Sequence, residues 1–214
     1  MHIGCSILAI AATLAGPAAA ATATLSGVVT ATGGVAPAMV VYVEKGPDPA
    51  PRAAPARKEM EQKDTEFQPR ALWVRAGDSV QFTNRDNFYH NVFSPGSETG
   101  FDLGLYRGGV AKTVELPRAG EIDVYCNIHP TMKAKVLVVP DERAAQVAAN
   151  GSYSLVGLAP GDYTIVAWSP AHEPVRREIH LRAGETAKAD FSLKPRGTQA
   201  AHLNKNGEQY GRYR

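Results

Sequence analysis

Four side chains with nitrogen or soft sulfur donor atoms stand close together in one part of the sequence. Cys126, His129 and Met132 follow one another at intervals of three residues in the stretch CNIHPTM, and His90 precedes Cys126 by 36 positions. Two imidazoles and a thiolate in a plane, with a weakly bound axial thioether, are the donor set of a blue-copper site. Because one tight loop can bring residues at these intervals to one point, the spacing predicts one copper ion bound by all four.

Other interpretations of these residues are weaker. A C-x-x-H pair alone indicates little, because buried cysteines and surface histidines are common. Zinc would require more cysteine or histidine ligands than the motif supplies. His172 and His180 are expected on loops of a second part of the chain, and Met39 and Met60 in a core or on the surface.

The first twenty residues have the composition of a secretory signal peptide. Residues 1–20 contain no Lys, Arg, Asp or Glu, and their apolar stretch ends at Gly16-Pro17, just before an Ala-x-Ala cleavage pattern. We therefore expect an exported protein, periplasmic or secreted, with no membrane span in its mature chain. Cys5 would leave with the signal, so Cys126 would be the one remaining cysteine and could form no internal disulfide.

Composition and charge describe an ordinary globular chain with an unusual end. The 214 residues are 44% apolar and 21% charged, and the net charge of +2 does not indicate a partner such as nucleic acid. Residues 194–214 carry five basic side chains against one acidic side chain, without an apolar pattern. Residues 195–214 are therefore predicted to be a basic, solvated and disordered tail.

The elements that must position the donors are short strands. Fifteen prolines and twenty glycines interrupt stretches of alternating apolar residues. One stretch, Glu121 to Cys126, places Ile122, Val124 and Cys126 on one face. Further strands are expected at 25–30, 39–44, 72–74, 79–83, 92–93, 112–116, 134–139, 178–181 and 188–193, and two within 150–168. The fold class is therefore all-β, built as sandwiches.

The donor motif and the strand before it resemble the cupredoxins of the plastocyanin/amicyanin group. The stretch CNIHPTMKAKVLVV is similar to amicyanin's short ligand loop, and DSVQFTNRDNFYHNVFS is similar to the strand that leads to the first histidine ligand. The resemblance implies a Greek-key β-sandwich with equatorial ligands His90, Cys126 and His129 and axial Met132. It also implies that Asn91 braces the ligand loops near the thiolate sulfur.

The flanking stretches resemble a different, smaller module. LSGVVTATGGVAPAMVVYVEKG is similar to the opening hairpin of a carboxypeptidase-regulatory-like (transthyretin-like) β-sandwich, and NGSYSLVGLAPGDYTIVAWSP to its continuation. Residues 24–46 with 144–194 are therefore expected to form this sandwich around a cupredoxin domain at 47–143. The alternative is a sequential arrangement in which the first strand pair belongs to the cupredoxin domain.

The resemblance implies an electron carrier and not an enzyme. Electrons would pass at the exposed edge of His129, near Phe88, Pro130 and Thr131, to transient redox protein partners of a monomer. Lys133 and Lys135 would steer an acidic partner. A copper carrier or storage protein would use the same ligands and remains the alternative. A copper oxidase or nitrite reductase would need a further copper at paired H-x-H ligands, and the sequence contains no H-x-H. A metal-free adhesion module is the remaining possibility.

Overall fold

The computed structural model describes residues 21–47, 53–96, 100–197 and 202–210. All the secondary-structure elements in these residues are β-strands, which confirms the all-β prediction. No helix of the described part is long and apolar enough to cross a membrane. The predicted signal peptide, residues 1–20 with Cys5, lies outside the described residues.

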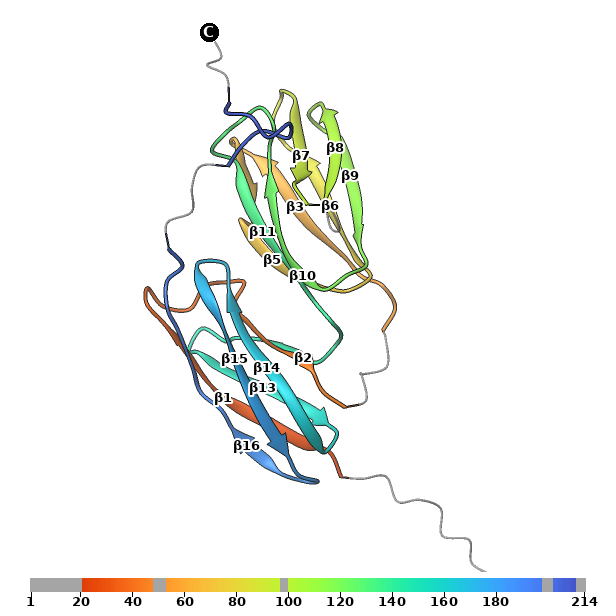
Figure 1. Ribbon diagram of the computed structural model, residues 1–214. Helices are drawn as coiled ribbons and strands as arrows, with labels where there is room; N and C mark the ends of the chain where they lie inside the picture. Colours follow the sequence, from red (N-terminus) through yellow and green to blue (C-terminus); the bar gives the residue numbers. More distant parts are fainter. Residues whose placement is uncertain (1–20, 48–52, 97–99, 198–201, 211–214) are drawn as a thin grey trace, which may run out of the picture.

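Two sandwiches lie end to end in the molecule (Figure 1). The central sandwich is formed by the strands in the middle of the sequence. One of its sheets has the order β5-β11-β10-β7-β8 and the other β4-β3-β6-β9. The strands are β3 (Arg57–Lys63), β4 (Glu66–Gln68), β5 (Ala71–Arg75), β6 (Asp78–Asn84), β7 (His90–Ser94), β8 (Phe101–Tyr106), β9 (Ala111–Leu116), β10 (Gly120–Tyr125) and β11 (Lys133–Val139).

The terminal sandwich is formed by strands from both sides of the central one in sequence. One sheet has the order β13-β1-β16, with β17 also paired to β1, and the other has the order β12-β2-β14-β15. The strands are β1 (Ala23–Ala31), β2 (Val40–Lys45), β12 (Ala144–Gln146), β13 (Ser152–Leu158), β14 (Gly161–Ser169), β15 (His172–Leu181), β16 (Thr186–Lys188) and β17 (Phe191–Leu193).

The first two strands do not form the hairpin that the sequence suggests. β1 pairs with β13, β16 and β17, whereas β2 pairs with β12 and β14 in the opposite sheet. The turn at Gly33 and Gly34 is present, and both glycines have positive φ. The chain thus crosses from one sheet to the other, and each strand finds its partners more than a hundred residues later in the sequence.

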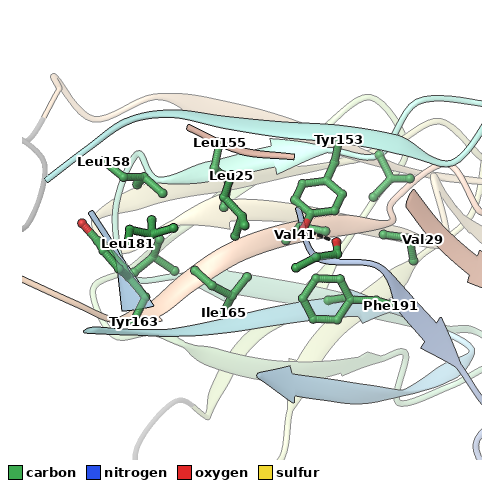
Figure 2. Packing of buried hydrophobic residues seen from close by; sticks show 14 of the residues in the cluster. Leu25, Val29, Val41, Tyr153, Leu155, Leu158, Tyr163, Ile165, Leu181 and Phe191 are labelled. Carbon is green, nitrogen blue, oxygen red and sulfur yellow. Dashed lines mark hydrogen bonds between the residues drawn. The ribbon is translucent and has the colours of Figure 1, made fainter. Parts of the chain in front are cut away.

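Apolar side chains from both sheets fill the terminal sandwich. Leu25 and Val29 of β1 face Val41 of β2 and Ile165 of β14 across the space between the sheets (Figure 2). Phe191 of β17 packs among them. Burial of these alternating side chains stabilises the sandwich by about 1.5–3 kcal/mol for each large aliphatic or aromatic residue.

An apolar cluster separate from the cores of the two sandwiches joins them. Leu137 and Val139 of β11 pack with Val40 of β2 and Trp168 of β14. At its edge the Trp168 indole N–H donates to the Glu121 carboxylate at the start of β10, at 2.5 Å. The sandwiches therefore share buried apolar surface as well as a polar contact.

Two strands of the central sandwich carry no clear sequence signal. β3 has the polar sequence RKEMEQK, and only Met60 and Gln62 in it are buried. β8 contains Gly104 with positive φ and pairs irregularly with β7. Sequence alternation marks β10 and β11 because they carry aliphatic residues, which β3 lacks.

Candidate metal centre

Neighbouring strands bring the predicted donors to one end of the central sandwich. His90 is the first residue of β7, and Cys126 follows directly after β10. β7 and β10 are hydrogen-bonded neighbours, with Phe93 opposite Tyr125. His129 lies in the loop that joins β10 to β11. The sheet therefore places a histidine and a cysteine side by side although 36 residues separate them.

The alternation predicted for the strand before Cys126 is present. Ile122, Val124 and Cys126 are buried in the core of the central sandwich, whereas Asp123 and Tyr125 face outward. The cysteine sulfur therefore points into the sandwich.

Three donor atoms form a triangle in this place. Cys126 Sγ lies 3.8 Å from His90 Nδ1 and 3.7 Å from His129 Nδ1, and the two imidazole nitrogens are 3.1 Å apart. A point equidistant from the three atoms lies about 2.1 Å from each, and metal ions such as zinc bind imidazole nitrogen and thiolate sulfur at about 2.0–2.3 Å. The triangle therefore has the size of a metal's first coordination sphere.

The loop after Cys126 folds back on itself. The Met132 N–H donates to the His129 carbonyl at 3.0 Å, and the Cys126 N–H donates to the Met132 carbonyl at 3.2 Å. Met132 is 1% exposed and belongs to the same apolar cluster as Cys126. These two hydrogen bonds close residues 126–132 into a compact turn.

A carboxylate holds the first histidine from the other side. His90 Nε2 lies 2.8 Å from Asp86 Oδ2, so its Nδ1 is the atom that faces Cys126. Asp86 is itself fixed, because its carboxylate accepts hydrogen bonds from the backbone N–H groups of Asp64 and Thr65. Such carboxylate–histidine pairs set the tautomer and orientation of metal-binding imidazoles.

Two segments of the chain match known protein families. Residues 55–139 match the family of copper binding proteins described as plastocyanin/azurin. These residues are therefore similar to a cupredoxin domain. Residues 128–194 match the carboxypeptidase regulatory-like domain, so both predicted resemblances are confirmed.

Individual relatives cover only part of the chain. Amicyanin-alpha of Methylorubrum extorquens is 33% identical over 75 residues, which are 34% of this chain and 63% of the relative. The chain thus spans less than two thirds of that relative's length. Among solved structures, a reduced mutant of amicyanin is 24% identical with a TM-score of 0.37, covering 46% of this chain and 97% of that one. The purple cupredoxin from Nitrosopumilus maritimus is 21% identical with a TM-score of 0.34, covering 37% and 97%.

The surroundings of the cysteine in the cupredoxin domain favour its thiolate. Burial raises the pKa of the Cys126 thiol, but hydrogen bonds from His90 and from the backbone N–H groups of Asn91, Ile128 and His129 outweigh burial, so the pKa lies below its usual value. A thiol must lose its proton to bind a metal. The fold therefore prepares Cys126 for that role before any ion arrives.

The two histidines differ in exposure and in the direction of their pKa shifts. Burial lowers the pKa of His90, but hydrogen bonds with Cys126 and Asp86 outweigh burial and raise it. Burial lowers the pKa of His129, and the nearby charge of His90 lowers it further, which favours the neutral imidazole that a metal needs. His90 is fully buried, whereas His129 is partly exposed beside Phe88. The Phe88 ring lies 5.1 Å from the His90 ring and 5.7 Å from the His129 ring.

Asn91 extends from the site toward β8. Its backbone N–H reaches the Cys126 sulfur, and its side-chain amide donates to Asp102 Oδ1 at 2.7 Å. The side chain thus braces the strand of the first histidine against β8.

The sequence does not predict the role of Asp86 or the location of two further histidines. The contact of Asp86 with His90 is not predicted by the sequence analysis. The one signal for it is the presence of a carboxylate four residues before His90. His172 and His180 lie in strand β15, not on loops. His172 is hydrogen-bonded to Ser169 and to the Thr32 carbonyl, far in sequence from the donor triangle.

The donor chemistry and the spacing of the atoms fit a copper ion. An imidazole nitrogen from each of two histidines and a cysteine sulfur converge within 4.8 Å of one another, and a thioether side chain is buried in the same loop. Soft sulfur donors with imidazoles suit copper in both oxidation states.

Proposed function

We propose that the protein is a type 1 (blue) copper protein that carries single electrons between redox partners. His90, Cys126 and His129 would hold one copper ion, with the Met132 thioether as a fourth, weaker donor. The observation that carries the proposal is the triangle of donor atoms, with sides of 3.1, 3.7 and 3.8 Å. A point at its centre lies at metal–ligand distance from all three atoms.

A copper ion bound there would supply one-electron redox chemistry, with no bond to a substrate formed or broken. The protein surrounds the site with a rigid environment, whose structure would change little when the charge of the site changes. His90 and Cys126 are both 0% exposed, and the loop hydrogen bonds at Met132 leave the ligands little freedom. Water is kept from the thiolate, which also protects it from oxidation.

Electrons would enter and leave at the partly exposed His129. Phe88 is 41% exposed, and Pro130 and Thr131 are exposed beside it, so an uncharged patch surrounds the imidazole edge. Transient redox encounters bury less than about 1,200 Å², so a patch of this kind suffices for a redox protein partner.

Only one of the two lysines expected to steer a partner is suited to that role. Lys133 is exposed, but Lys135 is buried and paired with Glu121 at 2.8 Å and with Asp123 at 2.5 Å. The prediction for Lys135 is wrong because its place on β11 next to β10 directs the ammonium group into a carboxylate pair.

The domain organisation and location belong to the same proposal. Residues 47–143 would form the cupredoxin domain, inserted between residues 24–46 and 144–194 of the carboxypeptidase-regulatory-like sandwich. The pairing of β1 with β13 and of β2 with β14 supports the insertion. A monomer in the periplasm, delivered by the leader at 1–20, would meet its partners there.

The decisive test is substitution of the thiolate. Cys126→Ser in protein loaded with copper is expected to abolish the intense blue charge-transfer band, because that band arises from the copper–thiolate bond. The wild type should show the band and a narrow copper hyperfine splitting in electron paramagnetic resonance. A blue Cys126→Ser protein would defeat the assignment. Fast Cu(I) transfer to a chelator together with slow electron self-exchange in the wild type would favour the copper carrier instead.

The axial assignment needs a separate test. Met132→Leu keeps an apolar side chain of similar volume but removes the thioether, so the blue band should persist while the reduction potential and the resonance spectrum change. Met60→Leu is the matched control, since Met60 is a fully buried methionine of the same core. Equal spectra and potentials for both variants would remove Met132 from the ligand set.

A further inference from the structure

The last described segment of the chain, residues 202–210, packs against the cupredoxin domain. The sequence predicts a solvated, disordered tail at 195–214. Most residues of 202–210 are exposed, but the segment forms hydrogen bonds and a ring contact with the domain. Figure 1 shows the segment in dark blue across the end of the central sandwich that carries β7, far from the terminal sandwich from which it comes. Its contacts lie on Tyr125, Cys126 and Asn127 at the end of β10 and on Asp102 of β8.

The first set of contacts holds the corner at Cys126. The Tyr210 hydroxyl donates to the Cys126 carbonyl at 2.8 Å. The backbone N–H of Lys205 donates to Asn127 Oδ1 at 2.9 Å. Since the Cys126 N–H already donates to Met132, both polar groups of the Cys126 backbone have partners, one in the loop and one in this segment.

The second set of contacts reaches the strand of the first histidine. Lys205 Nζ lies 2.7 Å from Asp102 Oδ2, and Asp102 Oδ1 accepts the hydrogen bond from the Asn91 side chain. One residue of the segment is thus connected to Asn91, next to His90, and to Asn127, next to Cys126. It bridges the two parts of the chain that supply the donor triangle.

The segment itself has a defined shape. Asn204 Oδ1 accepts hydrogen bonds from the backbone N–H groups of Asn206 and Glu208, and the Asn204 N–H donates to the Glu208 carbonyl. The His202 ring stacks on Tyr125 with centroids 4.1 Å apart and an interplanar angle of 20°. A turn closed in this way positions Lys205 and Tyr210 with little further loss of conformational freedom.

We infer that residues 202–210 are a strap that positions the ligand loop, with Tyr210 and Lys205 as its positioning residues. The strap holds the Cys126–Asn127 corner and ties it through Asp102 to the strand of His90. By stacking on Tyr125 it also covers that side of the domain and leaves the side of Phe88 and His129 open to a partner. The strap would act on the loop whether or not a metal is bound.

The first test uses the metal-free, full-length protein, so that it does not depend on the proposed copper function. Cys126 is 0% exposed, and a thiol reagent can reach it only when the loop opens. Tyr210→Phe keeps the ring but removes the hydrogen bond to the Cys126 carbonyl, together with a 3.2 Å contact between the hydroxyl and His202 Nδ1 within the segment. Since one hydrogen bond contributes about 0.5–1.5 kcal/mol, loss of the bond to the Cys126 carbonyl should make the thiol react about 2- to 13-fold faster.

Two further variants separate the strap from general effects. Lys205→Met keeps the backbone donor to Asn127 but loses the ion pair with Asp102, so it should accelerate the reaction less than the double variant with Tyr210→Phe. Tyr89→Phe is the matched control, since Tyr89 is 56% exposed near the site and its hydroxyl has no hydrogen-bond partner among the described residues. It should react at the wild-type rate.

Amide hydrogen exchange decides between positioning and overall destabilisation. Faster exchange confined to 126–132 and 90–91 in Tyr210→Phe supports the strap. Wild-type thiol reactivity in the double variant, or a uniform increase in exchange over the whole cupredoxin domain, overturns it. Absence of a blue copper spectrum in the copper-loaded wild type would count against the copper site and not against the strap, because the thiol and exchange measurements use metal-free protein.

Discussion

At the scale of single residues, the Asp86 carboxylate sets which nitrogen of His90 faces Cys126. It lies 2.8 Å from Nε2 and leaves Nδ1 for the donor triangle. Asp86→Asn removes the negative charge while keeping one oxygen acceptor. We expect copper affinity to fall roughly 10- to 100-fold, as for other partners of metal-binding histidines. Competition with a chelator of known affinity measures the change.

The chain offers a matched control for this substitution. Asp162 lies 2.7 Å from His180 Nδ1 on the surface of the terminal sandwich. Asp162→Asn should therefore leave copper affinity at the wild-type value. An Asp86→Asn protein that binds copper as tightly as Asp162→Asn would show that orientation of His90 does not depend on the carboxylate.

The donors could be predicted from sequence because their types are rare and their spacing is short. Cys126, His129 and Met132 lie within one loop, so no knowledge of tertiary structure is needed to group them. Asp86 could not be assigned in this way, because carboxylates are common and its contact with His90 depends on the turn between β6 and β7. The same holds for Tyr210, whose partner is a backbone carbonyl 84 residues earlier.

At the scale of strands, β1 has backbone neighbours on both sides. A side chain added at Gly27 would place its Cβ 1.9 Å from the Ala189 carbonyl oxygen, which belongs to the segment between β16 and β17. Gly27→Ala must therefore push this backbone away. We expect a loss of about 1–3 kcal/mol in the free energy of unfolding, measured by urea denaturation.

Gly197→Ala provides the comparison for this variant. Nothing lies within 4 Å of a Cβ built at Gly197, so the substitution should leave the free energy of unfolding within about 0.5 kcal/mol of the wild type. If Gly27→Ala were as stable as Gly197→Ala, the close approach of β1 to Ala189 would be disproved.

The strands themselves were predictable to different degrees. β10 and β11 show alternation or continuous apolar character because one or both of their faces are buried. β3 buries only Met60 and Gln62, and a strand with so few apolar residues has no sequence signature. Which strands pair cannot be read from local patterns, and for this reason the hairpin expected from β1 and β2 proved wrong.

At the scale of the whole molecule, Glu121 links the two sandwiches. Burial raises the pKa of its carboxyl, but hydrogen bonds from Lys135, Trp168 and Arg196 outweigh burial and hold the pKa below its usual value of 4.5. A carboxyl whose pKa is lowered in the folded state stabilises the fold at pH values above 4.5. That contribution is lost as the pH falls through the folded-state pKa.

Glu121→Gln tests this contribution. At pH 7 the variant should be less stable by about 1–2 kcal/mol, a value that allows for partial solvent screening. The difference from the wild type should shrink as the pH falls below 4.5. Thermal unfolding at several pH values measures both. Glu115→Gln, at an exposed position of β9, should show neither effect. A constant difference at all pH values would mean that the charge of Glu121 is not responsible.

The pairing of β1 has a consequence for biogenesis. Its partners include residues as distant as Asp190, 162 positions away from Val28. A nascent chain therefore cannot complete the terminal sandwich until nearly all of it has emerged, whereas His90 to Met132 are available much earlier. A polypeptide that stopped short of Tyr210 would contain every proposed ligand and yet lack the segment that braces them.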